Sequence, residues 1–573
     1  MTFMSNQQDK AVEPARGLVA LIDFACGSHA RAAALLVALA LLAFVPGFFQ
    51  IPPVDRDEAR FAQASKQMVE SGDYIDIRYQ QEVRYKKPVG IYWLQAAAVK
   101  TADAFGIPEA RTTIWIYRLP SLAGAVGAVL LSYWTALAFV SRRAAVIAAV
   151  MMASSILLGV EARLAKTDAM LLLTVVAAMG AMARVYLSGR QTPDTAVGWQ
   201  LPAIFWSALA AGVLLKGPLI FLFVGLAAAT VSILDRSARW LLALRPFAGV
   251  IWFAVLVLPW FVIILSRAGE TFIAESAGTD MLGKVFGSQE GHGAPPGLYF
   301  LLFWVTFWPG AVLAGLAAPM VWQSRREPAT KLLLAWLIPS WIVFELVVTK
   351  LPHYVLPLYP AIAILIAGIL DRGGLAKVPW MVFGTIGWFV FPVVMGIIAI
   401  VGFVAIGGEL GIVAWPFAAV AVVMGLFAWR LYEVDGAERA LLRATVSALF
   451  VGLTVFGVVV PSLPALFPSA TLATELRASG CAQPLAAAAG YHEPSLVFLV
   501  GTATRLIDGA GAADFLRQGP CRFALIEARN ERSFVQRAEA IGVRYAPLPR
   551  VDGINISNGR AAVISVFRSG SEP

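Results

Sequence analysis

The chain has 573 residues, of which 59% are hydrophobic and only 14% are charged. Soluble domains carry roughly a quarter charged residues, so this composition excludes an ordinary soluble protein and indicates a membrane protein. The net charge of +9 could suggest nucleic acid as a partner. The basic residues, however, lie in short loops between apolar runs, as membrane topology requires, so we expect no nucleic-acid binding.

The N-terminal segment 1–31 is polar and mixed in charge, and the first apolar run follows it. No small-residue cleavage site follows Phe48 and Phe49, so we expect a cytoplasmic tail and a retained first helix instead of a cleaved signal peptide. Runs such as Ala32–Phe49, Phe247–Leu265 and Val378–Ile406 are long enough to cross a bilayer core of about 30 Å. They must be helical, because lipid offers the backbone no hydrogen-bond partners.

Hydropathy predicts about thirteen membrane spans of ~20 residues each. We place them at 32–50, 114–140, 144–160, 168–187, 201–217, 218–234, 247–266, 297–321, 331–348, 354–370, 378–403, 411–430 and 443–462. Alternate loops are rich in Lys and Arg, for example at Arg142-Arg143, Arg236, Arg325-Arg326, Arg372 and Arg430. Because basic loops stay inside, the N-terminus is predicted to be cytoplasmic.

The chain divides into a transmembrane part, 32–462, and a water-soluble tail, 463–573. Two long loops, 51–113 and 267–297, are predicted on the outer face. In the tail we predict strands at Ser495–Val500, Phe523–Glu527 and Ala561–Phe567, and a helix at Glu531–Ile541. The expected fold is a mainly α membrane protein with amphipathic loop helices and a small C-terminal α/β periplasmic domain.

Two of the three cysteines, Cys481 and Cys521, fall in this tail. The predicted compartment is oxidising, so a disulfide between them is plausible. Cys26 lies in the cytoplasmic tail and has no evident partner. None of the three has the spacing of a metal ligand set.

Near the start of the first outside loop, Asp57 precedes a helical pattern from Glu58 to Val69 that Ser71-Gly72 should end. Its apolar face carries Phe61, Ala64, Met68 and Val69, and its polar face carries Arg60, Gln63, Lys66 and Gln67. A carboxylate at a helix N-terminus is kept ionised by the helix dipole. Asp57 could therefore act as a general base or orient an acceptor, or it could be a plain helix cap.

Lys86 and Lys87 precede Pro88 and an aromatic stretch containing Tyr92 and Trp93, which suits an interfacial helix. Lysines held at headgroup depth are natural phosphate ligands. The alternative is simple contact with lipid headgroups.

Further polar residues lie at the predicted outer ends of other spans. A charge in or near the membrane is costly, so each of these residues is a candidate for a functional role. They are Arg163, Lys166, Asp168, Lys216, His292, Lys350 and His353. Each could be a topological anchor, but a cation such as Lys216 on the outside opposes the positive-inside bias. For the histidines we favour a structural role over metal binding.

Several of these stretches form a recognisable set: Asp57–Phe61, Ser71–Tyr74, Arg84–Pro88, Arg163 to Asp168, Lys216–Pro218 and Leu351–Pro357. Together with the many spans and the outside tail, the set resembles the lipid-linked sugar transferases of the glycosyltransferase-C superfamily. The similarity is greatest to the bacterial aminoarabinose:lipid A transferases and their protein-mannosyltransferase-like relatives. It covers nearly the whole chain.

The resemblance implies transfer of a sugar from a polyprenyl (undecaprenyl) phosphate to lipid A, lipopolysaccharide or another periplasmic acceptor, with inversion. It implies catalytic roles for Asp57, its neighbour Glu58, and Asp168. Phosphate contacts fall to Lys86, Lys87, Arg163 and Lys216. Further candidates for substrate contact are Arg60, Tyr85, Tyr92, His292, Lys350, His353 and Tyr354.

Some relatives carry an acidic residue before the Lys-Pro pair that is implicated in metal binding, and this chain has Lys86 there. We therefore expect no cofactor and favour a metal-independent mechanism, while a divalent metal stays an open alternative. Expected partners are the lipid-linked sugar, a glycolipid acceptor and membrane lipids, with the protein a monomer in the bacterial inner membrane. The rival function is a transporter, which would place its polar residues near the bilayer midplane.

Overall fold

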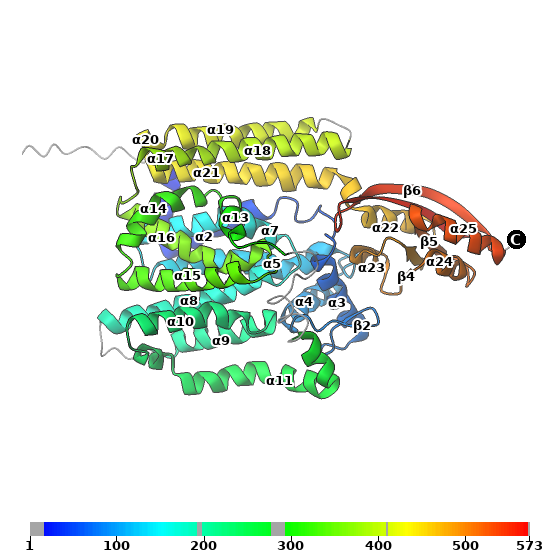
Figure 1. Cartoon of the computed structure of the whole chain (residues 1–573), viewed down its shortest axis with the longest axis horizontal. Helices are drawn as coiled ribbons and strands as arrows, with labels where there is room; N and C mark the ends of the chain where they lie inside the picture. Colours follow the sequence, from blue (N-terminus) through cyan, green and yellow to red (C-terminus); the bar gives the residue numbers. More distant parts are fainter. Residues whose placement is uncertain (1–16, 192–197, 277–292, 408–410, 571–573) are drawn as a thin grey trace, which may run out of the picture.

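The computed structural model of the chain describes residues 17–191, 198–276, 293–407 and 411–570. Long helices run side by side in one bundle, and a smaller unit of strands and helices lies beyond one end of it (Figure 1). Two short helices and a small hairpin from the first loop, α3, α4 and β1–β2, lie at that same end. The charged groups described below therefore gather where the bundle meets the smaller unit.

The bundle begins with α1 (Leu18–Cys26), α2 (His29–Phe44), α5 (Ile114–Ala136), α6 (Arg142–Ser154), α7 (Ile156–Ala162), α8 (Asp168–Gln191), α9 (Gln200–Lys216), α10 (Leu219–Leu234) and α11 (Pro246–Ile273). It continues with α13 (Leu298–Thr306), α14 (Ala311–Gln323), α15 (Pro328–Leu346), α16 (Tyr359–Asp371), α17 (Pro379–Phe383), α18 (Gly387–Gly402), α19 (Trp415–Arg430), α20 (Tyr432–Asp435) and α21 (Ala437–Gly452). A 3₁₀ segment, η3 (Pro352–Leu358), precedes α16.

Among the described residues, eight helices are long and apolar enough to span a membrane, or up to ten if two bent pairs each count as one span. The predicted count of thirteen is therefore not confirmed. The three remaining predicted spans correspond to α2, α9 and α10, which have 16, 17 and 16 residues. At 1.5 Å per residue they are about 25 Å long, shorter than a bilayer core of about 30 Å.

The centre of the bundle is built on small side chains. Every residue of α6 from Ala144 to Ser154 is buried, and α6 packs against α2, α5 and α16. Small residues let helix backbones approach closely, which is how helices associate where lipid provides no hydrophobic drive. By contrast, the most apolar stretches of Pro246–Ser276, which contains α11, and of Pro379–Gly407, which contains α18, are only 22% and 17% buried. These helices therefore present their side chains to lipid.

The first loop forms α3 (Asp57–Ser71), the hairpin of β1 (Arg78–Tyr79) and β2 (Glu82–Val83), and α4 (Gly90–Ala104). The predicted loop helix is confirmed, and it ends at Gly72, whose φ of 74° is left-handed and suits glycine. The prediction of an exposed polar face is wrong in part. Gln63 is 0% exposed and Lys66 is 3% exposed, because the C-terminal unit covers them.

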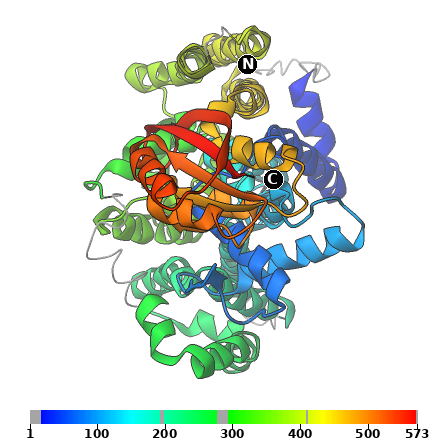
Figure 2. The same cartoon turned by 90° about the vertical axis from the view of Figure 1, so that its right-hand side faces the viewer.

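The C-terminal unit contains α22 (Pro468–Ala478), β3 (Leu485–Ala489), α23 (Pro494–Val500), β4 (Arg505–Ile507), α24 (Gly509–Leu516), β5 (Arg522–Glu527), α25 (Glu531–Ala540), β6 (Tyr545–Asn555) and β7 (Arg560–Ser569). Its five strands form one mixed sheet in the order β4-β3-β5-β7-β6. Figure 2 shows the molecule from the end where this unit lies. The strands β3, β4 and β5 are parallel, and β7 runs antiparallel to both β5 and β6.

The structure confirms the strands predicted around Phe523–Glu527 and Ala561–Phe567 and the helix predicted at Glu531–Ile541. The predicted strand Ser495–Val500 is wrong, because these residues form helix α23. A short, largely apolar run such as Ser495–Val500 does not distinguish a strand from a buried helix, and Pro494 at the first helical position favours the helix.

The two cysteines of the C-terminal unit, Cys481 and Cys521, are joined by a disulfide with their Cα atoms 5.8 Å apart. It ties the segment after α22 to the start of β5 and borders one of the two hydrophobic clusters on the sheet. Cys26 is a free cysteine.

Candidate active site

A cavity of about 290 Å³ is lined by the first loop, the turn between α7 and α8, the last residue of α9 and residues from 349 to 354. Its charged lining consists of Asp55, Arg56, Asp57, Glu58, Arg60, Arg84, Lys86, Lys87, Lys166, Asp168 and Lys216. Seven of these side chains are basic and four are acidic, so the cavity has an excess of positive charge. Such a cavity favours an anionic ligand.

Helix ends position the main groups. Asp57 is the first residue of α3 and Asp168 is the first residue of α8, so both carboxylates lie at positive helix N-termini. Lys216 is the last residue of α9, where the helix dipole favours a cation. Residues far apart in the sequence thus meet because their helices begin or end at one level.

The segment with the paired lysines reaches this level because Gly90 lies directly against α9. A Cβ atom at Gly90 would lie 2.7 Å from the Leu214 carbonyl oxygen, closer than real Cβ contacts come. Only glycine therefore lets the start of α4 pack at the end of α9, beside Lys216. Lys86 is exposed and Lys87 is half-buried, and the Lys87 ammonium donates a hydrogen bond of 3.0 Å to the Lys86 carbonyl.

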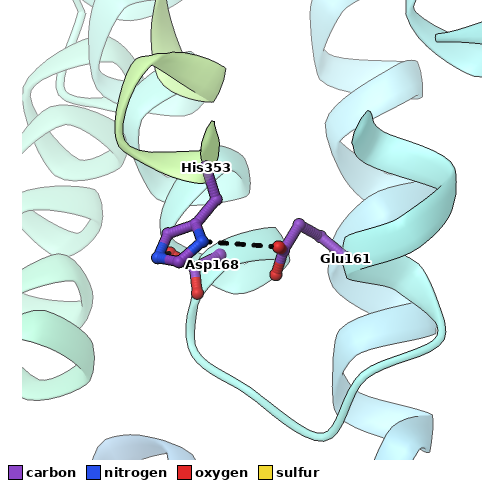
Figure 3. Close-up of side chains that lie close together, drawn as sticks. All are labelled: Glu161, Asp168 and His353. Atoms are coloured by element: carbon purple, nitrogen blue, oxygen red, sulfur yellow. Dashed lines mark ion pairs between the residues drawn. The ribbon is translucent and has the colours of Figure 1, made fainter. Parts of the chain in front are cut away.

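A buried ion network surrounds Asp168. Lys216 forms a direct ion pair with its carboxylate, and the Lys166 ammonium lies 3.8 Å from it and 3.2 Å from Glu161. The His353 ring lies between the two acids, with Nδ1 3.6 Å from Glu161 and Nε2 3.7 Å from Asp168 (Figure 3). The network joins α7, α8, α9 and η3.

Glu161, Asp168 and His353 could be considered as metal ligands, since their donor atoms all lie within 4.8 Å of one another. A divalent ion at about 2.0–2.2 Å from such donors would lie beside the ammonium groups of Lys166 and Lys216. These two cations already balance the two carboxylates. The donor set therefore does not fit a divalent ion, and we derive no catalytic step through one.

The Asp57 carboxylate is half-buried in the cavity wall. Burial alone would raise its pKa, but Lys166 and Arg84 outweigh burial, and the pKa is lowered. Burial likewise acts to lower the pKa of Lys166, while Glu161, Asp168 and Asp57 raise it above its usual value. Asp57 and Lys166 are thus both charged at neutral pH.

Glu58 lines the same wall, but its carboxylate is fully engaged. It accepts hydrogen bonds from the Arg118 guanidinium at 2.7 and 2.9 Å and from the backbone N–H groups of Val54 and Ala165. Arg118 donates in turn to the backbone carbonyls of Phe48, Ile51 and Pro52, in the segment after α2. These contacts favour a structural role for Glu58 over the predicted catalytic one.

Arg163, which the resemblance assigned to phosphate contact, is engaged with backbone carbonyls in this structure. Its guanidinium donates to the carbonyls of Ala43, Pro46 and Gly159 and lies 4.4 Å from the Phe456 ring centre. It does not line the cavity. The sequence could not show this, because two of these carbonyls, those of Ala43 and Pro46, belong to the end of α2 and the turn after it.

The remaining predicted contacts divide into two groups. Arg60, His353 and Tyr354 line the cavity, with the Lys216 ammonium 5.4 Å from the Tyr354 ring centre. Tyr85, Tyr92 and Lys350 do not line it: Tyr85 donates to Asp76, Tyr92 packs on Phe61, and the Lys350 ammonium donates to the Val347 carbonyl. His292 lies outside the described residues.

Sequence reasoning did not mention Glu161, and it noted Lys166 and Arg84 without giving them a role in the site. Arg84 is buried and its guanidinium lies 5.3 Å from the Phe61 ring centre. The signal for Glu161 was an acid directly after a long apolar run, since charge at a membrane is costly without a partner. Lys166, five residues further along the chain, provides that partner, with its ammonium 3.2 Å from the Glu161 carboxylate.

Comparison with known proteins independently supports the resemblance to lipid-linked sugar transferases. Residues 34–269 match the family described as dolichyl-phosphate-mannose-protein mannosyltransferase. The chain is 26% identical over 341 residues to an undecaprenyl phosphate-alpha-4-amino-4-deoxy-L-arabinose arabinosyl transferase of Pectobacterium atrosepticum, covering 56% of this chain and 55% of that one. A protein of the same name from Aeromonas hydrophila is 27% identical over 428 residues, covering 70% and 73%.

The solved structure of ArnT from Cupriavidus metallidurans bound to undecaprenyl phosphate superposes with a TM-score of 0.69 at 19% identity. The superposition covers 93% of this chain and 97% of that one, so the fold is shared over nearly the whole length. The chain is therefore similar to ArnT in fold and, at 26–27% identity, to these arabinosyl transferases in sequence. The matches to the first curated relatives span only about half of those proteins' length.

The mannosyltransferase family match includes Asp57, Lys87, Asp168 and Lys216, but ends before His353 and the C-terminal unit. The ArnT-like fold therefore has a well-matched first half that carries most of the cavity. The second half of the chain lies outside this family match and is similar to ArnT in its fold.

Proposed function

We propose that this ArnT-like protein transfers a sugar from an undecaprenyl or similar polyprenyl phosphate to a lipid A, lipopolysaccharide or other periplasmic acceptor. The observation that carries the proposal is the cavity at the helix ends, in which an ionised Asp57 faces several basic side chains. The curated relatives named above act on an undecaprenyl phosphate-linked aminoarabinose according to their names. A sugar phosphate has the charge that such a cavity would accept.

In the proposed reaction the acceptor oxygen attacks the anomeric carbon, and the bond from that carbon to the phosphate oxygen breaks. The bonding electrons leave with the phosphate, whose growing negative charge Lys86, Lys87 and Lys216 can stabilise. Attack from the face opposite to the phosphate inverts the anomeric centre. No nucleotide is required, because the donor carries its own leaving group.

Asp57 would act on the acceptor. If the acceptor is a hydroxyl group, its proton passes to the Asp57 carboxylate as the new bond forms. If the acceptor is an anionic phosphate, no proton needs removal, and Asp57 would orient the acceptor instead. Asp168 would hold Lys216 in place through the ion pair between them.

The proposed location is the inner membrane, with the cavity facing the periplasm. Lys and Arg are enriched in loops at the opposite ends of the helices, such as the one with Arg325 and Arg326, which precedes α15. The Cys481–Cys521 disulfide at the cavity end suits an oxidising compartment. Because one chain forms the cavity, we propose that the monomer is active.

A transporter is not favoured by the position of the charges. Transporters bind their substrates near the middle of the membrane, between discontinuous helices. Here the first residues of α3 and α8 and the last residue of α9 provide the charged groups. Charges at helix ends support a reaction at the membrane surface.

The test is mass spectrometry of lipid A, core and O-antigen from cells with and without the gene, complemented by wild type or Asp57→Ala. We expect one added sugar to disappear without the gene, to return with wild type, and to stay absent with Asp57→Ala at equal membrane abundance. Full modification by Asp57→Ala would contradict the proposal. So would accumulation of an unchanged substrate on one side of the membrane, which indicates transport.

A further inference from the structure

We propose that the C-terminal unit is a working part of the site, and that Asp55 and Glu493 are positioning residues through which it holds Asp57 in place. This inference rests on the proposed function and adds a role for residues 463–570. It concerns the short segment 54–57, here called the Asp57 loop, which lines the cavity and leads into α3.

The C-terminal unit contacts the Asp57 loop on the two residues before Asp57. The backbone N–H of Ser495 donates a 2.9 Å hydrogen bond to the Asp55 carboxylate, and the Arg56 guanidinium donates to the Ser557 carbonyl. Ser495 lies in the first turn of α23, where a free N–H group attracts a carboxylate. Both contacts cross more than 400 positions of the sequence.

Arg56 has an unusual backbone that needs such support. Its φ is 68° and its ψ is −113°, a combination that costs a residue with a side chain free energy and persists only where the surroundings hold it. This conformation turns the chain into the first residue of α3, which is Asp57. Loss of the contacts at Asp55 and Arg56 should therefore let the turn relax and move the Asp57 carboxylate.

Glu493 organises the other side of this contact. Its carboxylate accepts hydrogen bonds from Asn555 at 2.7 Å and from the Ser557 hydroxyl at 2.8 Å. Glu493 directly precedes α23, so these hydrogen bonds join the start of α23 to the turn between β6 and β7. These are the two parts that contact Asp55 and Arg56. Glu493 does not line the cavity, so its effect on the reaction must pass through the Asp57 loop.

The interface continues along the whole of α3. The buried Lys66 ammonium donates to the Phe498 carbonyl at 2.9 Å, and the buried Gln63 amide donates to Thr502 at 2.8 Å. The Phe498 ring packs on Tyr117 of α5 at 5.1 Å, so α23 contacts both the loop helix and the bundle. Polar groups are buried at low cost only when they are paired, which indicates a permanent interface.

None of the described residues after 463 lines the cavity, so the C-terminal unit acts on position and not on the reacting atoms. Position matters, because a displacement of about 1 Å at a reacting group can lower the rate by roughly 10²-fold. We therefore expect loss of these contacts to lower kcat while leaving the donor KM nearly unchanged, since the lysines that would bind phosphate are untouched.

The experiment measures kcat and KM with purified full-length protein and a synthetic polyprenyl-phosphate sugar. Asp55→Ala removes the acceptor of the Ser495 hydrogen bond, and we expect kcat to fall by roughly 10–100-fold, the range for a misplaced group. Asp55→Asn keeps an oxygen acceptor, and we expect it to restore most of the rate. Glu493→Ala should lower kcat similarly, and the double variant Asp55→Ala/Glu493→Ala should be little worse than either single variant.

The matched control is Arg477→Ala, which removes the exposed 3.1 Å ion pair with Glu109 between the same two parts of the molecule, away from the Asp57 loop. It should keep wild-type kcat. Wild-type kcat in both Asp55→Ala and Glu493→Ala would overturn the inference, and so would equal losses in Asp55→Asn and Asp55→Ala. Failure of the proposed function is distinguishable, because wild type itself would then show no transfer.

Discussion

Lys216, the last residue of α9, forms a direct ion pair with Asp168, the first residue of α8. Both side chains are buried, at 8% and 5% exposure, and both line the cavity. This pair joins the start of α8 to the end of α9, the helix that follows it in the sequence. In the proposed reaction it would place one positive charge beside the leaving phosphate.

The Asp168–Lys216 pair should behave as one unit in kinetics. We expect Lys216→Met and Asp168→Asn each to lower kcat by roughly 10²-fold or more, the usual effect of losing one stabilising group at a developing charge. The variant carrying both substitutions should be little worse than either alone, because each single change already breaks the pair. Losses that multiply in the double variant would show that the two side chains act independently.

Glu58 provides a test of structural against catalytic assignment. Its buried ion pair with Arg118 has both side chains 1% exposed, and removing one partner of such a pair costs about 3–5 kcal/mol. We expect Glu58→Gln to lower the thermal unfolding temperature in detergent, with loss of activity following the loss of folded protein. Unchanged stability together with lost activity would instead support the catalytic role that the sequence suggested.

Asp55 should make the stability depend on pH. Burial, the largest cause, raises its pKa to about 7, and Glu493 adds to this while Ser495 and Arg60 oppose it. Since the folded pKa lies above the unfolded value of 3.8, the stabilising contribution is complete below about pH 4 and is lost as the pH rises through 7. The unfolding temperature should therefore be higher at pH 6 than at pH 8.

Asp55→Asn removes the titrating group and should flatten this difference. Differential scanning fluorimetry of both proteins at the two pH values makes the comparison. If the unfolding temperature changes equally between pH 6 and pH 8 in wild type and Asp55→Asn, another group causes the pH dependence.

Chelation should leave the activity unchanged. The cluster of Glu161, Asp168 and His353 is balanced by Lys166 and Lys216 and does not suit a divalent ion. We expect the same kcat after dialysis against EDTA and after addition of Mg²⁺, Mn²⁺ or Zn²⁺. Loss of activity with EDTA that one of these ions restores would contradict the charge argument.

Much of the site could be predicted because a charged side chain in or near a membrane is energetically costly and therefore often marks a functional site. Asp57, Lys87, Asp168 and Lys216 each border an apolar run, and the structure brings all four to one cavity. Arg163 met the same criterion, yet its guanidinium turns to the carbonyls of Ala43 and Pro46. Sequence position alone does not show which way a long side chain turns.

Two errors in the predicted fold concern α3 and α23, which pack against each other although they are far apart in the sequence. Gln63 and Lys66 have the spacing of an exposed helix face, but α23 buries them. Ser495–Val500 has the composition of a strand, but as helix α23 it packs along α3. Pro494 was a local signal for helix α23, whereas the burial of Gln63 and Lys66 depends on contacts across more than 400 residues, which leave no local signal.

The most direct measurement of the central claim is sugar transfer by purified protein from a synthetic polyprenyl-phosphate sugar, comparing wild type with Lys87→Met. The control is Lys100→Met, which changes an exposed lysine on the next helix that lies over Tyr74 and outside the cavity. The account predicts that Lys87→Met lowers kcat/KM by roughly 10²–10³-fold while Lys100→Met retains the wild-type value. Equal activity in all three proteins would contradict a phosphate-binding cavity at Lys87.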